Sequence, residues 1–453
     1  MFQKLEKLIF YSLIFSIPFQ TRIVLRSWGI GFNEWNSAFL YETDLLIFAL
    51  LVFWFLRQFT FYDISQNVNS RSKIFFSNYD WFLIVFFIIS AISIKNASNQ
   101  ALGFYQLIKL VEFSLLYFYV KSNLGAVFNL VTAFFVFLAS GFFQAVLAIL
   151  QYIRQTDMGL RFLGETVLNP NLFNVATFLV NGEKIMRPYG TTPHPNVLAF
   201  FLFLSVFIFI FLYLYYLVGS GKSEKSNLIT SKISLILYAT LLFGFFLTFS
   251  RIIIFVWLVG VISRFIVINK KFPAFAKSPA MKNLWVSTAV ILLFFLIIFW
   301  PQVLARLDIS TSEEAFSLRG FYNKVSLYDK PFFGVGLGNF VNWFKEINPG
   351  LASNLYQPVH NIYLLIFSET GILGLAAFLL FLIFLAKDYL SIKFTRPFHY
   401  SLFIIFLSLL FFGLFDHYPW TLQQGRIILF LTVGLLAAIS PHSSVDRAQV
   451  SGA

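Results

Sequence analysis

The residues that could do chemistry begin where a long polar segment ends and an apolar run starts, at 357–374. His360 stands at this boundary, and Glu369 follows nine residues later, which at helical rise is about 13 Å further along the axis. The imidazole would therefore lie where water meets a membrane, and the carboxylate would lie inside the hydrocarbon. Ionisable groups at such positions are costly, so they indicate function unless they pair within the bundle. An imidazole that titrates near neutral pH could accept a proton there.

Three arginines stand where predicted helices begin or end. Arg187 precedes an apolar run, Arg251 lies in a very short turn, and Arg319 lies on a predicted loop helix. For each alone, the ordinary alternative is an arginine that extends to the membrane surface. Arg251 fits that alternative least, because the bias of basic residues towards the cytoplasm opposes it in an outward turn. Several guanidiniums on one face would suit a diphosphate, since the planar fork binds phosphate oxygens bidentately and stays charged.

Other polar groups have structural explanations that compete with function. His360 could be an interface histidine, and both Glu369 and the Lys109–Glu112 pair could be polar contacts inside a bundle. Histidines at 194, 360 and 417 face outward, yet their spacing matches no zinc pattern. The chain has no cysteine, which excludes disulfides and thiolate metal sites. We therefore expect neither a metal nor a cofactor.

The glycines are interpreted as packing devices. The segment 334–338 resembles a nucleotide loop superficially, but no strand precedes it and no Lys-Ser/Thr follows it. We expect a loop fitted closely to a ligand or to the bundle. Gly371 and Gly374 are expected to allow close approach of helices.

The elements that must position these residues are membrane spans. The chain is 58% hydrophobic and only 12% charged, whereas an ordinary soluble domain carries about 25% charged residues. We predict an all-α polytopic membrane protein with about twelve transmembrane helices. One span lies at the N-terminus, within 1–25, and the others start near residues 44, 81, 102, 126, 195, 232, 251, 284, 361, 400 and 421.

An even number of spans puts both termini on one side of the membrane. With that side cytoplasmic, more than half of the Lys and Arg residues fall in cytoplasmic segments, as the positive-inside rule requires. The net charge of +13 then reflects topology rather than nucleic-acid binding. We predict one transmembrane domain over 1–440 and a disordered cytoplasmic tail at 441–453.

Two outward loops, 151–194 and 306–360, are far longer than the other connections, and loops of that length are usually functional or disordered. In the second loop, which joins predicted spans nine and ten, Ser310 with Glu313 and Thr311 with Glu314 each fit a capping box. Apolar residues then recur at helical spacing through Tyr328 until Pro331. We expect an amphipathic helix across the outer mouth of the bundle.

The order and sidedness of these motifs resemble the O-antigen ligase and polymerase superfamily. The motifs run from Arg187 to Gly374: Arg187…Pro195-Asn196, Ser250-Arg251, Arg319…Gly334-x-Gly336-x-Gly338, and His360-Asn361…Glu369-x-Gly371. The resemblance implies transfer of a glycan from an undecaprenyl-diphosphate carrier to an acceptor hydroxyl such as that of lipid A-core. It also implies a bacterial inner membrane, an active site facing the periplasm, and no metal.

Under this resemblance, His360 is the catalytic base, and Arg187, Arg251 and Arg319 bind the diphosphate. Supporting roles are considered for four further residues: Asn196, Asn361, Glu369 and His194. Direct attack at the anomeric carbon would invert its configuration. Ligases and polymerases share these motifs, so both activities stay open. A transporter or flippase is the alternative from another class, because about twelve spans with charged groups at mid-depth would also fit one.

Overall fold

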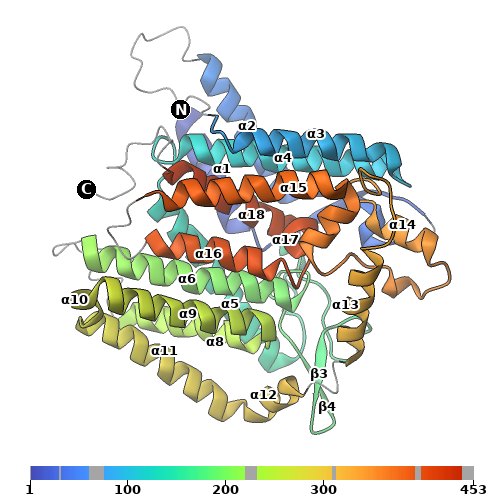
Figure 1. The fold of residues 1–453 in the computed structure, drawn as a ribbon. Helices are drawn as coiled ribbons and strands as arrows, with labels where there is room; N and C mark the ends of the chain where they lie inside the picture. Colours follow the sequence, from blue (N-terminus) through green and yellow to red (C-terminus); the bar gives the residue numbers. More distant parts are fainter. Residues whose placement is uncertain are drawn as a thin grey trace.

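The computed structural model describes residues 2–29, 32–60, 76–219, 232–308, 313–392 and 399–440, and these form a mostly helical bundle (Figure 1). The principal helices lie side by side, most of them roughly along one direction and others slanting across it. They are α1 (Phe2–Ser16), α2 (Glu42–Thr60), α3 (Asp80–Ser93), α4 (Gln100–Asn123), α5 (Leu130–Arg154), α6 (Pro195–Gly219), α8 (Lys232–Leu247), α9 (Arg251–Lys271), α11 (Pro279–Ile298), α15 (Ile362–Leu390), α16 (His399–Phe412) and α18 (Gln423–Ile439).

Six of the described helices are long and apolar enough to cross a membrane: α4, α5, α6, α9, α11 and α15. Three shorter apolar stretches, in α8, α16 and α18, accompany them. The prediction of a polytopic, mostly helical membrane protein is therefore confirmed. The total of about twelve spans stays a prediction.

The bundle is organised around α6, whose apolar stretch is completely buried. A helix that is hydrophobic all round is stable only when neighbours cover every face, and α5, α8, α9 and α16 pack against α6. The outer helices α9 and α11 instead expose large apolar side chains, including Ile262, Val290 and Ile297. In a bilayer these side chains would contact lipid, which a helix tolerates because it satisfies its backbone polar groups internally.

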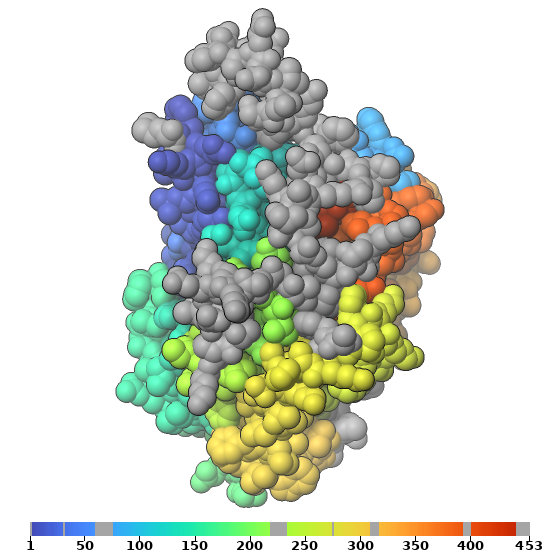
Figure 2. Space-filling model, turned by 90° about the vertical axis from the view of Figure 1, so that its left-hand side faces the viewer, coloured from blue at the N-terminus to red at the C-terminus, as the bar shows by residue number. Residues whose placement is uncertain are grey.

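The two ends of the described chain lie at the same end of the bundle. Gln3 Nε2 donates to Ala126 O over 2.8 Å, and Tyr79 Oη lies 3.4 Å from Ser440 Oγ. Lys121 forms an ion pair with Asp80 at this same end of the bundle. Figure 2 views this end, with the N-terminal helices and α9–α11 on opposite sides of the face. The arrangement agrees with termini on a common side; the predicted tail at 441–453 lies outside the described residues.

Two small sheets depart from the all-α prediction. Strands β1 (Arg22–Ser27) and β2 (Ser37–Tyr41) form one antiparallel pair, and β3 (Thr177–Val180) and β4 (Glu183–Met186) form the other. The predicted first span over 1–25 is therefore too long, because α1 ends at Ser16. Pro18 follows at once, and proline lacks the amide and the geometry to continue a helix. The apolar residues Ile23, Val24 and Leu25 belong to an exposed strand instead.

The loop over 306–360 contains the expected helix, α13 (Glu313–Val325), and a second one, α14 (Phe340–Ile347), that was not expected. Helix α13 ends at Val325 rather than near Pro331, and Tyr328 is 49% exposed. After the helix, the Lys330 ammonium and the Ser326 hydroxyl bond to nearby carbonyls, and such contacts compete with further helical bonds. The predicted caps at Ser310 and Thr311 lie outside the described residues. The other long loop holds the β3–β4 hairpin, after α5 has extended to Arg154.

Candidate active site

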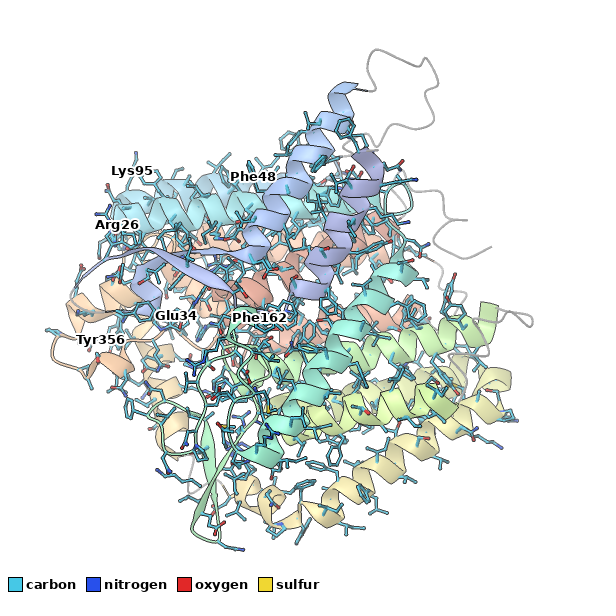
Figure 3. The ribbon with its side chains drawn as sticks, turned by 180° about the vertical axis from the view of Figure 1, so that it is seen from behind. Arg26, Glu34, Phe48, Lys95, Phe162 and Tyr356 are labelled. Carbon is cyan, nitrogen blue, oxygen red and sulfur yellow. The ribbon has the colours of Figure 1, made fainter. Side chains whose placement is uncertain are left out.

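A polar cavity of about 800 Å³ opens at the end of the bundle opposite the termini. Its walls come from segments far apart in the sequence: the β1–β2 connection, the residues before α6, helix α13, the segment before α15, and the turn between α16 and α17 (Tyr418–Thr421). Figure 3 shows Glu34 and Tyr356, both cavity residues, at this same end. Of the predicted site residues, His194, Asn196, Arg319 and His360 line the cavity.

His360 is held at the cavity wall immediately before α15. The helix is capped by Asn361, whose side chain accepts hydrogen bonds from the amides of Tyr363 and Leu364, so the imidazole has no capping role. The ring lies 6.0 Å from Tyr322 and 5.0 Å from His417, measured between centroids. Its Nδ1 atom is buried and has no hydrogen-bond partner within the described ranges. The imidazole therefore carries a polar atom whose hydrogen bond the described residues do not supply.

The environment keeps His360 neutral. Burial, followed by the neighbouring His417, lowers the pKa of His360 to about 3. His194 is also kept neutral, because burial and then the charge of Arg187 lower its pKa to about 3. A neutral imidazole is the form that can accept a proton, so both side chains are in the protonation state that a base requires.

Asn196 links the cavity to Arg187. Its backbone amide donates to His194 Nδ1 over 3.1 Å, and its side-chain oxygen accepts from Arg187 Nη2 over 2.8 Å and from Ser250 Oγ over 3.1 Å. Arg187 Nε also donates to the carbonyl of Thr248 over 2.7 Å. The guanidinium is buried, and burial followed by the charge of Arg306 lowers its pKa to about 9. At neutral pH it is still a cation, in a fixed orientation.

Arg251 does not line the cavity but lies in an adjoining cationic cluster. It is exposed at the start of α9, and its Nη1 donates to the carbonyl of Arg306 over 3.3 Å. Arg306, at the end of α12 (Trp300–Leu307), donates through Nε to the carbonyl of Phe249 over 3.3 Å. Burial and the charge of Arg251 lower the pKa of Arg306 to about 10. Arg306 was not among the predicted site residues, although a basic residue at an outward helix end could have indicated it.

Sequence reasoning also missed Asp416, and it noted His417 only as an outward histidine. The Asp416 carboxylate accepts from the amide of Tyr418 over 3.2 Å and lies 3.4 Å from Asn196 Nδ2. Burial alone would raise the pKa of Asp416, but the surrounding histidines and Arg319 outweigh it and lower the pKa. His417 Nδ1 lies 2.7 Å from Thr421 Oγ1. The signal was available: an Asp-His pair occupies a short outward turn between two apolar runs.

Glu369 and the glycine-rich loop lie elsewhere. Glu369 accepts hydrogen bonds from the backbone of Gly338 and Phe340 and from Trp420, and it lines a separate inner chamber. The amide of Gly336 donates to the Glu369 carbonyl over 3.1 Å, and a Cβ on Gly334 would overlap the Glu369 backbone. The loop is thus fitted to the bundle, which was one of the two expectations. Lys109 pairs with Glu112 over 3.2 Å and also with Asp44, as expected for polar contacts between helices.

Within the part of the chain that the structure describes, no three histidine or acidic side chains are arranged to hold a metal ion. The expectation of metal-independent chemistry stays a prediction. What the geometry offers is a neutral imidazole, a second imidazole beside a carboxylate, and the Arg319 guanidinium in a single cavity, with Arg187 linked to it through Asn196.

The fold and the cavity define a polytopic membrane protein whose basic and imidazole groups meet at one end of the bundle. Residues 236–379 match the sequence model of the Wzy_C family, described as O-Antigen ligase. The match confirms the resemblance to the O-antigen ligase superfamily and supports a membrane enzyme of the ligase and polymerase type. It contains Arg251, Arg319 and His360, whereas Arg187 and Asp416 lie outside it. A search of curated proteins gave no match to the chain.

Proposed function

We propose that this protein is an O-antigen ligase-like glycosyltransferase. It moves a glycan from an undecaprenyl-diphosphate carrier to an acceptor hydroxyl, of lipid A-core or a similar molecule, at the outer face of the bacterial inner membrane. The observation that carries the proposal is His360, whose Nδ1 has no partner among the described residues, in one polar cavity with Arg319 and next to a cluster of further arginines. The family match supports the coarser class, a ligase- or polymerase-type membrane enzyme.

The guanidiniums supply what a diphosphate leaving group needs. Hydrogen bonds from Nε and Nη2 hold the Arg187 guanidinium in place. Besides burial, the charges of three further arginines lower its pKa: Arg306, Arg251 and Arg319. Such a concentration of positive charge around a buried guanidinium is unfavourable in the empty protein and is relieved when an anion binds. Preorganised cations also stabilise the negative charge that develops as the carrier leaves. We assign Arg187, Arg251, Arg306 and Arg319 to the diphosphate.

His360 removes the acceptor proton. The acceptor oxygen attacks the anomeric carbon, the bond from that carbon to the phosphate oxygen breaks, and its electron pair stays on the diphosphate. The proton moves to the imidazole of His360, and the configuration at the anomeric carbon inverts. Asp416, next in the chain to His417, would stabilise the cation that forms, because its charge raises the pKa of His360. A diphosphate bound nearby would raise the pKa of His360 from its low value in the empty site.

The direct test uses purified protein in nanodiscs with a polyprenyl-diphosphate glycan and candidate acceptors. We expect release of the bare carrier together with a glycosylated acceptor. Transfer to lipid A-core would identify a ligase, whereas extension of a second carrier-linked glycan would identify a polymerase. Movement of the intact donor across the membrane without carrier release would instead identify a flippase and refute the proposal.

A further inference from the structure

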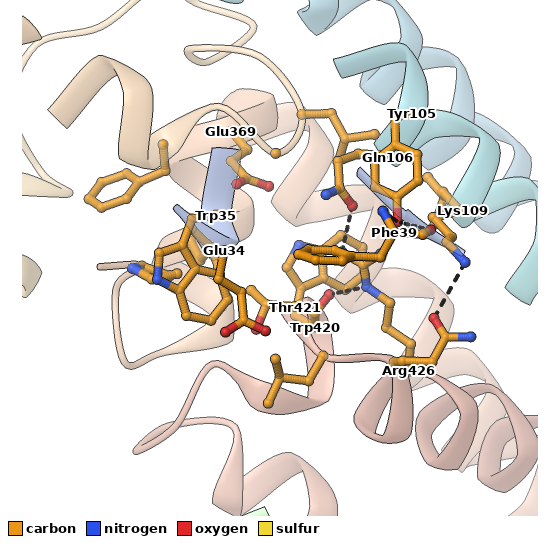
Figure 4. A pocket seen from close by; sticks show the side chains of 18 of the residues that line it. Glu34, Trp35, Phe39, Tyr105, Gln106, Lys109, Glu369, Trp420, Thr421 and Arg426 are labelled. Carbon is orange, nitrogen blue, oxygen red and sulfur yellow. Dashed lines mark hydrogen bonds between the residues drawn. The ribbon is translucent and has the colours of Figure 1, made fainter. Parts of the chain in front are cut away.

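A second, inner chamber lies behind the wall of the candidate active site. It shares Glu34, Trp35 and Leu422 with the active-site cavity and extends inward between β2, α4, α14, α15 and α18 (Figure 4). Its volume is about 70 Å³, which is room for about five water molecules, since about 10–15 Å³ of such volume holds one. A single sugar ring with its hydroxyls displaces a comparable amount of water. Nothing in the proposed transfer step uses this chamber.

The lining combines aromatic rings with planar polar groups. Trp35, Phe39, Tyr105 and Trp420 supply ring faces and edges, and Gln106 supplies an amide. An aromatic face buries the apolar C–H side of a pyranose, while amides and guanidiniums bond its hydroxyls. A purely structural core would pack with few voids. The chamber instead keeps an open space with a partly polar lining next to the candidate active site.

The lining of the chamber holds two acidic residues, Glu34 and Glu369, and two basic residues, Lys109 and Arg426, so its formal charges cancel. Arg426 Nη2 donates to Gln106 Oε1 over 2.8 Å, and Arg426 Nε donates to the carbonyl of Trp420 over 2.5 Å. Glu34 pairs with Arg22 over 2.6 Å, and Lys109 pairs with Asp44. The Glu369 carboxylate is held by backbone amides. Because no charge is left in excess, the lining suits a neutral ligand rather than an acidic one.

The position of the chamber indicates whether it would hold part of the donor or part of the acceptor. A chain of contacts runs from Arg187 to Asn196 over 2.8 Å and from Asn196 to Asp416 over 3.4 Å. The next residue, His417, lies 5.1 Å from Trp35 on its other side, between ring centroids. His417 also contacts His360. The imidazoles thus lie between the arginine cluster and the chamber, so a donor diphosphate on the arginines would leave the chamber on the acceptor side.

We propose that the inner chamber binds one neutral pyranose unit of the acceptor, next to the unit that carries the attacked hydroxyl. The assignment to the acceptor rests on the proposed function, whereas binding of a neutral sugar does not. Trp35 and Trp420 hold the faces of the ring, and Gln106 and Arg426 bond its hydroxyls. The chamber would then select the acceptor by the shape of a sugar that does not itself react.

The test fills the chamber without touching the active-site cavity. Val341 is 7% exposed and lines only the chamber, so Val341→Phe should occupy its space, and Val341→Ile is the matched control. Glucose, galactose and N-acetylglucosamine serve as probes, with glucuronate as the charged control, and saturation-transfer NMR in nanodiscs measures binding. We expect at least one neutral probe to bind wild type and Val341→Ile. Val341→Phe should bind about tenfold more weakly, and glucuronate should not bind.

The transfer assay supplies a second readout. Val341→Phe should raise the KM for the acceptor about tenfold and leave the KM for the donor unchanged. If Val341→Phe does not fold, Gln106→Ala should weaken both readouts in the same direction. Absence of neutral-probe binding to wild type, or equal binding to Val341→Phe, overturns the proposal. Neutral-sugar binding that Val341→Phe abolishes, in a protein that transfers nothing, would refute the proposed function but keep the chamber as a sugar site.

Discussion

His360 and His417 meet edge to face, with their ring centroids 5.0 Å apart. His360 immediately precedes α15, and His417 lies in the turn that follows α16. Asp416 stands next to His417 in the same turn. Two imidazoles this close cannot both be charged at low cost, and the charge of His417 would lower the pKa of His360. A proton taken up by either ring is therefore stabilised by the Asp416 carboxylate, and it opposes protonation of the other ring.

His360→Ala should abolish transfer while the donor still binds. Loss of a positioned base typically lowers the rate 10²- to 10⁴-fold, whereas the diphosphate is held by arginines. Binding of carrier-linked glycan and release of bare carrier, measured separately in nanodiscs, distinguish the two effects. If the variant transfers at nearly the wild-type rate, His360 is structural, and the base must be sought at His417 or His194.

The pH profile should reflect the buried state of His360. Because burial lowers its pKa to about 3 in the empty site, its neutral form persists as the pH falls below 6.5. The kcat/KM of wild type should therefore stay nearly flat from pH 8 to pH 6. The charge of Arg319 also lowers this pKa, so Arg319→Gln should move the acid limb towards higher pH. A profile that falls through pH 6.5 in wild type, unchanged by Arg319→Gln, would contradict this.

Arg251→Lys should be almost as damaging as Arg251→Ala. The lysine ammonium keeps the charge but cannot reproduce a bidentate contact to phosphate, and loss of one such donor costs on the order of 10²-fold in kcat. Arg251 is exposed at the start of α9, so both variants should fold. Arg161→Ala, which removes another exposed arginine from a loop at the same end, is the control and should transfer normally. Near-normal turnover by Arg251→Lys would show that only charge matters.

The topology can be tested by cysteine labelling, since the chain contains no cysteine. Ser353→Cys lies in the loop between α14 and α15, beside the active-site cavity, and should react with an impermeant reagent from the outside. Ser391→Cys follows the opposite end of α15 and should react only from the cytoplasm. Both are exposed in the structure. Labelling of Ser353→Cys only from the cytoplasm would reverse the proposed sidedness of the site.

The membrane character, the positions of the long apolar helices and the presence of helix α13 could all be predicted from the sequence. The sequence also selected Arg187, Arg251, Arg319 and His360. Hydropathy and helical period were sufficient for this because they describe each segment relative to water and lipid. They were misleading at the N-terminus, where an apolar run forms strand β1 rather than the end of a span.

Only the tertiary structure decided which of these groups share a cavity. A segment's own pattern states its depth in the membrane but not its lateral neighbours. For this reason the local signals could mark Asp416 and Arg306 as polar residues at outward helix ends, but they could not show that both lie beside His360 or Arg187. His360 precedes α15 and lines the active-site cavity, whereas Glu369 lies within α15 and lines the inner chamber. Its partners Gly338 and Trp420 come from other segments, and their packing alone determines its surroundings.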